Sequence, residues 1–411
     1  SSLLFTSFIL FFTALVFNIR ALNSICTGCI LVFGLLDSPP KKTLNTVPRI
    51  LLWLLLCCAL CVLLELLSLT RTQHVPDNWS RIRTSTGIIA VPLAMIFSFT
   101  FIEKYRSRLM LVFAALIIAA SFYCLIAAAA AFSSSHQSNV FFYHALVHPL
   151  HHHAVFFSVF VFTALVFLTE NRAQLFISVN RYIFRFVLFY LSVILILLSS
   201  KLVIISYCIY ITWLLAGILR KQGKRSTLVR GVTFVFTIGM LLLVLTPNPV
   251  GNRFRNLLRG DISIISRERF RPADSFNGFQ FRALQWRFVP VILTQTHTWL
   301  SGTSPGDAQH YLDAKYIEEN MYTGEPGSTD HGFIGYNAHN QLLQSLLELG
   351  IPGGLLFLAI AGCLVFLARK QRKRGFTMVT GLLLAYSLLE SVFCTQYGIV
   401  LFLFFPLHLS R

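Results

Sequence analysis

The chain has 411 residues, of which 55% are hydrophobic and only 12% are charged, and its formal net charge is +18. Soluble domains carry roughly 25% charged residues, so this composition excludes an ordinary soluble enzyme, a disordered chain and a secreted disulfide scaffold. It predicts a polytopic, all-α integral membrane protein, in which the basic excess needs a topological explanation before nucleic-acid binding is considered.

Apolar stretches recur along the chain at lengths that suit membrane crossing, because a bilayer core of about 30 Å needs roughly 20 apolar residues per helix. On this scale we predict about twelve transmembrane helices. The first is expected to be a retained helix, since no signal peptide is evident. The predicted spans cover residues 3–19, 21–36, 50–69, 86–102, 109–132, 154–169, 183–199, 202–219, 231–246, 351–368, 377–393 and 397–410.

The Lys and Arg residues outside these spans predict the orientation of the chain. The two densest basic tracts, 220–225 and 369–374, lie two predicted spans apart and therefore on the same side. Cytoplasmic loops are enriched in Lys and Arg, so we expect these tracts and both termini in the cytoplasm. We expect charged loops such as 103–108 on the cytoplasmic side as well. The opposite short loops carry few basic residues, namely Arg20, Arg71, Arg81, Arg83 and Lys201.

The region 247–350 is much longer than the other loops and is predicted to be a mainly helical loop on the periplasmic side. It has nine basic and ten acidic residues, with the basic residues concentrated in its first part. Long loops in compact proteins are usually functional or disordered, and helical periodicity at 278–296 and 339–349 favours order. We therefore divide the chain into N-terminal helices (1–246), a periplasmic loop with the candidate catalytic residues (247–350) and C-terminal helices (351–411).

Cysteines and histidines give little indication of a metal or a cofactor. Most of the nine cysteines lie in apolar runs, and the long polar loop has none, so we expect packing rather than disulfides. Five histidines, including His152, gather at 144–153, but short spacing alone does not build a closed tetrahedral zinc site. A glycan- or phosphate-facing rim and plain interfacial polarity are both open for this patch. No phosphate-binding loop or dinucleotide fingerprint occurs, and no cofactor or metal is predicted.

Charged residues near the predicted outer ends of spans are further candidates. Arg282 and Trp286 lie four residues apart on one helical face, and an interfacial Arg could bind a diphosphate through its planar fork. Lys201 is the only basic residue of its short outer turn. Glu390 could pair with Arg282 or Lys201, or could orient His339. A structural ion pair or an interfacial anchor is the alternative for each of them.

The most specific pattern in the chain starts at His339 and Asn340, which nine residues separate from Gly350, with Gly353 following. We expect Asn337 to cap a helix whose leucines recur at helical spacing, and Gly350 to end it. His339 would then lie in the first turn, where the helix dipole disfavours an imidazolium, and a general base must be neutral. A histidine that only caps or packs is the alternative.

This pattern resembles the signature of the bacterial O-antigen ligase family, which also includes Wzy-type polymerases and protein O-oligosaccharyltransferases. The predicted topology, with a large outer loop before the tenth span, is similar too. The resemblance implies a catalytic His339, with Arg282 and Lys201 on the donor diphosphate. Relatives commonly have Ser-Arg where this chain has Ser200-Lys201, so the charge is kept but the fork is lost. Further donor or acceptor contacts are expected at Asn340, Glu390, Trp286, His152 and Arg271.

The resemblance implies a glycosyltransferase of the bacterial inner membrane that acts on the periplasmic face. It would move a glycan from an undecaprenyl-diphosphate carrier to a hydroxyl of lipid A–core, with inversion and without a metal. Its expected partners are these substrates and membrane lipids, not nucleic acid. A Wzy-type polymerase or a protein O-oligosaccharyltransferase is the alternative, and the Arg cluster at 253–271 could serve either acceptor. A transporter of lipid-linked glycan would need polar residues along a midplane path, whereas charges here cluster at span ends.

Overall fold

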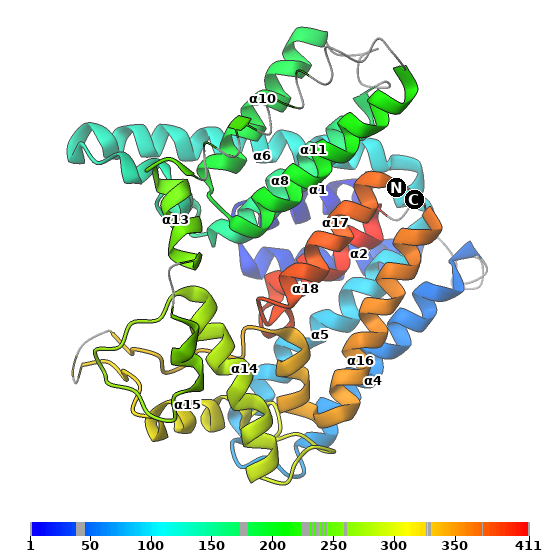
Figure 1. Cartoon of the computed structure of the whole chain (residues 1–411). Coiled ribbons are helices and arrows are strands. Elements are labelled where there is room, and N and C mark those ends of the chain that lie inside the picture. Colours follow the sequence, from blue (N-terminus) through cyan, green and yellow to red (C-terminus); the bar gives the residue numbers. More distant parts are fainter. Residues whose placement is uncertain are drawn as a thin grey trace. The chain divides into compact units, whose positions relative to one another are not determined.

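In the part of the chain that the computed structural model describes, all regular secondary structure is helical and no β-strand occurs (Figure 1). The predicted all-α class is therefore confirmed. The described residues are 2–37, 46–172, 180–222, 231, 234, 238–239, 242, 245–258, 261–325, 327, 330–371 and 373–409.

Helices occupy all the predicted spans except 231–246, most of which lies outside the described residues. Among the described residues, four helices are long and apolar enough to cross a membrane, or five if the bent pair Tyr143–Leu150 and Ala154–Glu170 is one span. This supports a multi-pass membrane protein, while the count of about twelve stays a prediction. The helices at the predicted spans are α1 (Ser2–Val16), α2 (Arg20–Asp37), α4 (Arg49–Ser68), α5 (Val75–Phe97), α6 (Phe99–Ser135), α8 (Ala154–Glu170), α10 (Arg181–Leu197), α11 (Lys201–Gln222), α16 (Gln341–Gln371), α17 (Arg374–Ser387) and α18 (Gln396–Leu409).

The loop predicted at 103–108 is wrong, because these charged residues lie inside helix α6. The chain breaks earlier, at Ser98, which separates α5 from α6 and whose hydroxyl donates to the Ile30 carbonyl oxygen at 3.3 Å. Glu, Lys and Arg have high helix propensities, so a short charged run does not by itself end a helix.

The chain forms two compact units. The first comprises Ser1–Cys29, Phe101–Leu258 and Lys373–Leu382, and the second comprises Ile30–Thr100, Arg259–Arg372 and Leu383–Arg411. Helix α8 is the centre of the first unit, where it packs against α7 (Tyr143–Val147), α10 and α11. Its sequence is apolar on every face, as expected for a helix surrounded by protein, and Phe157, Phe160 and Phe162 are fully buried.

The second unit joins membrane-type helices to most of the long loop. Helix α4 packs against α5 and α16, and α5 packs against α18. Beside them, α14 (Gly278–Gln295) and α15 (Ala308–Glu318) share a hydrophobic core with the first turns of α16. The largest fully buried side chains of this core are Phe288 and Tyr316. The predicted helical periodicity at 278–296 therefore corresponds to α14, which places Arg282 one turn after its start.

The segment 302–307 of the long loop is buried and is hydrogen-bonded to the residues before α5 within the second unit. The Asp307 carboxylate accepts hydrogen bonds from the backbone N–H groups of Gln73 and His74, both at 3.0 Å, and from Ser304 Oγ at 2.8 Å. Burial by itself would raise the pKa of Asp307, but these hydrogen bonds and one with the His74 ring lower the net pKa. An ionised Asp307 therefore stabilises this junction.

Candidate active site

His339 lies in a tight turn immediately before α16, and its backbone is left-handed, with φ of 44°. A side chain with a Cβ atom rarely adopts this conformation, and when one does, it is often at a functional site. The Asn337 side chain accepts a hydrogen bond from the His339 N–H at 3.0 Å, which stabilises the turn. The surrounding structure therefore holds His339 in a strained but defined position.

The predicted helix start at Asn337 is wrong by three residues. Helix α16 begins at Gln341, and Asn340 is its cap, since the Asn340 Oδ1 atom accepts from the Leu343 N–H at 3.2 Å. His339 consequently precedes the helix instead of lying in its first turn. The left-handed residue turns the chain before the helix can begin, and the sequence pattern could not reveal this.

Three side chains from distant parts of the second unit meet at this turn. His339 Nδ1 lies 2.8 Å from Glu390 Oε2, and Arg282 Nη2 donates to Glu390 Oε1 at 2.6 Å. The side chains of His339, Glu390 and Arg282 are 18%, 21% and 26% exposed, respectively. The three residues therefore form a partly accessible chain in which one carboxylate bridges an imidazole and a guanidinium.

Glu390 lies outside the helix in which it was predicted, because α17 ends at Ser387. Arg282 holds this segment in place, since its Nε donates to the Leu389 carbonyl at 2.9 Å. Its Nη1 donates to the Gly278 carbonyl at 2.9 Å, one turn back along α14. These contacts and the pair with Glu390 use three of the five N–H donors of a guanidinium, which leaves two for a ligand.

The charge state of Glu390 determines what His339 can do. Burial by itself would raise the pKa of Glu390, but the hydrogen bond with His339 and the positive charges of a protonated His339 and of Arg282 have the larger combined effect, and the net pKa is lowered. An ionised carboxylate can only accept hydrogen bonds. In a neutral ring, Nδ1 of His339 therefore carries the proton and Nε2 keeps a lone pair. This arrangement can accept a proton from a bound hydroxyl group.

The two glycines of the motif, Gly350 and Gly353, are required for different structural reasons. Gly350 interrupts α16 with φ of 68°, and a Cβ atom there would lie 2.6 Å from the Leu300 carbonyl carbon. The segment that packs against it caps the helix end, since the N–H groups of Thr303 and Ser304 donate to the carbonyls of Leu347 and Glu348. At Gly353, a Cβ would lie 2.6 Å from the Ser345 carbonyl oxygen. Both positions thus exclude larger residues.

The comparison with protein families supports the resemblance noted in the sequence. Residues 186–358 match the family described as O-antigen ligase. This segment belongs to the O-antigen ligase family. The match includes Lys201, Arg282 and His339, and it supports a glycan-transferring membrane enzyme. A search of curated proteins found no match.

The remaining residues predicted around the O-antigen ligase motif have different surroundings. Trp286 lies on α14 one turn after Arg282, and its indole N–H is buried without a hydrogen-bond partner among the described residues. Asn340 is 8% exposed and caps α16, as described above. Lys201 begins α11 in the first unit, after the left-handed Ser199. A role of Lys201 in binding the donor stays a prediction from the resemblance.

His152 is buried and does not lie on an exposed rim. It is 8% exposed, and its Nε2 lies 3.0 Å and 3.1 Å from the carbonyl oxygens of Leu15 and Val16, at the end of α1 in the first unit. A histidine in this setting links two segments of the fold. Within the described ranges, no group of three His, Cys, Asp or Glu side chains is placed to hold a metal ion.

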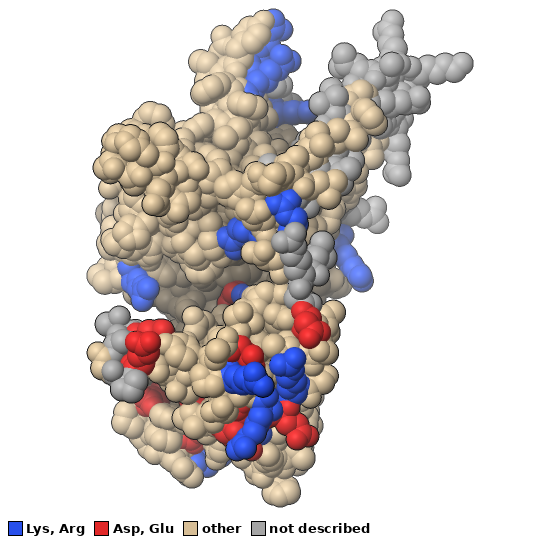
Figure 2. Space-filling model, turned by 60° about the vertical axis from the view of Figure 1, so that its left-hand side comes forward, with Lys and Arg blue, Asp and Glu red and all other residues tan. Residues whose placement is uncertain are grey.

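The described arginines of 253–271 are divided between the two units. Arg253 lies over the Tyr143 ring, and Arg255 donates to the Leu245 carbonyl oxygen, both in the first unit. Arg259 lies outside the described residues, whereas Arg271 is exposed in the second unit. Over the part of this unit at the bottom of Figure 2, acidic side chains lie next to the basic ones. A role of Arg271 in acceptor binding stays a prediction.

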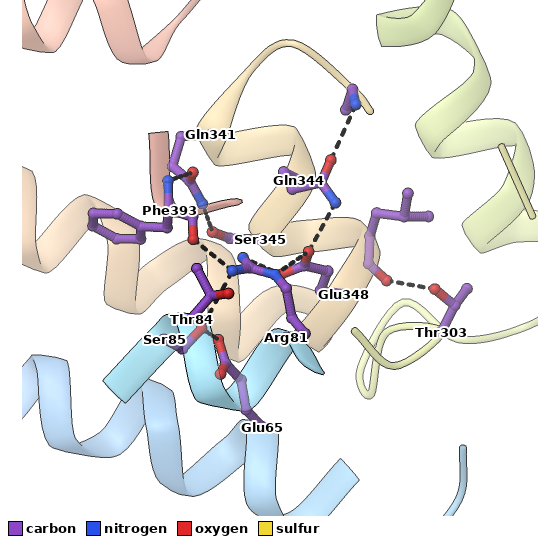
Figure 3. Close-up of polar contacts among 12 residues, drawn as sticks. Glu65, Arg81, Thr84, Ser85, Thr303, Gln341, Gln344, Ser345, Glu348 and Phe393 are labelled. Atoms are coloured by element: carbon purple, nitrogen blue, oxygen red, sulfur yellow. Dashed lines mark hydrogen bonds and ion pairs between the residues drawn. The ribbon is translucent and has the colours of Figure 1, made fainter. Parts of the chain in front are cut away.

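The sequence analysis did not reveal that Arg81 belongs to a group of buried charged residues (Figure 3). Arg81, counted there only as a basic residue of a short outer loop, lies on α5 and pairs with Glu348 of α16. Glu65 of α4 lies nearby and accepts from Ser85 Oγ at 2.9 Å. The available signal was the occurrence of Glu65 and Glu348 in otherwise apolar helical stretches, where a carboxylate requires a partner.

Proposed function

We propose that the protein is a glycosyltransferase that moves a glycan from a polyprenyl-diphosphate carrier to an acceptor hydroxyl, with His339 as the general base. The observation that carries this proposal is the contact of His339 with an ionised Glu390, in a region that belongs to the O-antigen ligase family. The carboxylate orients the ring and stabilises the imidazolium that forms when the acceptor loses its proton.

In this mechanism the acceptor oxygen attacks the anomeric carbon of the donor glycan while Nε2 of His339 takes its proton. The glycosidic bond to the carrier phosphate breaks, the bonding pair leaves with the diphosphate, and direct displacement inverts the anomeric centre. The two N–H groups of Arg282 that are not used within the protein would stabilise the developing charge on the leaving group. No metal ion is part of this proposal.

For the acceptor we propose lipid A–core, which makes the reaction an O-antigen ligation on the periplasmic face of the inner membrane. The family description names O-antigen ligase, and a Wzy-type polymerase is the alternative that the test below separates from it. An undecaprenyl carrier would be the donor. The Lys and Arg distribution supports the periplasmic side for the long loop.

The test is transfer by purified protein from a lipid-linked oligosaccharide to rough lipopolysaccharide. We expect His339→Ala to lower the rate by roughly 10²- to 10⁴-fold, the usual contribution of a general base. His331→Ala is the matched control, because His331 is an exposed histidine of the same loop. Near wild-type transfer by folded His339→Ala protein would refute the base. Elongation of the carrier-linked glycan without lipopolysaccharide, and no transfer when it is supplied, would replace the ligase by a polymerase.

A further inference from the structure

The hydrogen bonds around Arg81 connect the two segments that carry His339 and Glu390. Arg81 Nε and Nη2 donate to the two carboxylate oxygens of Glu348, each at 3.1 Å (Figure 3). The two side chains are 11% and 4% exposed. A planar fork that meets both oxygens of one carboxylate fixes direction as well as distance, so α5 and α16 are held in one register at this point.

From Glu348 the contacts lead to the turn that holds His339. The Glu348 Oε1 atom accepts from Gln344 Nε2 at 2.8 Å, and Gln344 Oε1 accepts from the backbone N–H of Ala338 at 3.0 Å. Ala338 is the residue before His339 and is fully buried. The position of the left-handed turn is therefore linked to Arg81 through two side chains.

From Arg81 a second route leads to the segment that carries Glu390. Arg81 Nη1 donates to the carbonyl oxygen of Phe393, three residues after Glu390. The backbone N–H of the same Phe393 donates to Gln341 Oε1 at 2.7 Å, and Gln341 is the first residue of α16. The backbone C=O and N–H groups of Phe393 are thus both hydrogen-bonded to side chains of the buried group.

The third part of the buried group orients Arg81 itself. Arg81 Nη1 also donates to Ser85 Oγ at 3.3 Å, and Ser85 Oγ donates to Glu65 Oε1 at 2.9 Å. Arg81 therefore has direct partners on α5, α16 and the 393 segment, and Ser85 connects it to Glu65 of α4. Such a network allows few alternative arrangements.

We propose that Arg81 is a positioning residue for the reaction, which aligns His339 with Glu390 through Glu348, Gln344 and the Phe393 backbone. This inference rests on the proposed function and deepens it, because Arg81 would act without touching a substrate. Loss of its fork lets the His339 turn and the Glu390 segment move relative to each other. Misplacement of a reacting group by about 1 Å costs up to roughly 10²-fold in rate.

The decisive variant is Arg81→Lys, which keeps the positive charge but removes the planar fork. The matched control is Arg83→Lys, on the same helix but exposed. Hydrogen–deuterium exchange of the purified full chain should be faster in 337–344 and 389–394, whereas α14 and α15 should keep wild-type rates. In the transfer assay, kcat should fall by about 10- to 100-fold with a KM for the donor close to that of the wild type.

Unchanged exchange in these two segments would overturn the proposal, and so would an increase spread evenly over the protein. Local opening with a wild-type kcat would overturn it as well. If Arg81→Lys does not fold, the double variant Arg81→Gln/Glu348→Gln removes both charges together and undergoes the same measurements. Exchange does not depend on the chemistry, so the exchange result stays interpretable even if His339→Ala retains transfer and the proposed function fails.

Discussion

The second unit contains two Arg–Glu pairs that look alike in sequence but differ in how completely their hydrogen bonds are used. In the buried pair, Arg81 meets both oxygens of Glu348, and the side chains are 11% and 4% exposed. In the outer pair, Arg282 uses one nitrogen on Glu390, and the side chains are 26% and 21% exposed. The second oxygen of Glu390 contacts His339 instead.

This difference indicates which pair serves stability and which serves chemistry. In a buried bidentate pair, removing one side chain leaves the charge of the other unpaired in a low-dielectric environment. The outer pair is partly solvated, and two N–H groups of its guanidinium have no acceptor among the described residues. It also contacts His339, whose ring can gain or lose a proton. We therefore expect substitutions in the first pair to affect mainly folding and alignment, and those in the second to affect mainly the rate.

The largest effect on stability should come from Glu348→Ala, which leaves Arg81 buried without its carboxylate. Breaking a buried pair in this way costs about 3–5 kcal/mol. Unfolding of the purified protein in mild detergent would measure it. Glu268→Ala is the control, because Glu268 is exposed in the same unit, so its loss should change little. Equal stability of the two variants would remove the distinction between the pairs.

Glu390→Gln should have the opposite profile, with a large loss of rate and a small loss of stability. The amide keeps the shape of the side chain but cannot stabilise an imidazolium as a carboxylate does, so transfer should fall by roughly 10²-fold or more. Initial rates would be compared with those of Glu268→Gln, which changes an exposed carboxylate of the long loop. A wild-type rate in folded Glu390→Gln protein would contradict the role of this carboxylate.

Gly350→Ala should destabilise the helix break that lies two residues after Glu348 along α16. The left-handed backbone costs a Cβ-bearing residue about 1–3 kcal/mol, and the 2.6 Å approach to the Leu300 carbonyl carbon adds repulsion. Gly362→Ala on the same helix has open space around its Cβ, so it should be neutral or stabilising. Unfolding of the two variants side by side would reveal a difference, and its absence would show that the break tolerates a side chain.

The smallest effect concerns acid pH. The lowered pKa of Glu390 means that its contribution to stability is fully present above the ordinary carboxyl value of 4.5 and is lost as pH falls through the lower pKa of the folded state. The difference in apparent Tm between wild type and Glu390→Gln should therefore narrow below about pH 4.5. A difference that stays constant down to about pH 3 would contradict the assignment.

The parts of the molecule that sequence predicted best are those set by local composition. Apolar stretches and helical periodicity gave the helical class and α14, and Gly350 marked the break in α16. The helix start at 341 was missed because the left-handed backbone of His339 depends on contacts with Asn337 and distant segments. Arg81 was missed because its acceptors on Glu348 and Phe393 lie far away in the chain, and single-sequence patterns contain no information on such pairing.

The break at Gly350 also fixes the length of the first part of α16. Nine residues separate the cap Asn340 from Gly350, and at 1.5 Å per residue they span about 13 Å, or two and a half turns. Gly350 is packed against the backbone at Leu300, and the opposite end presents His339 to Glu390. Inserting or deleting one residue would rotate the histidine by about 100° around the helix axis. Substitutions in this segment away from Gln341, Gln344 and Glu348 should therefore be tolerated far better than changes in its length.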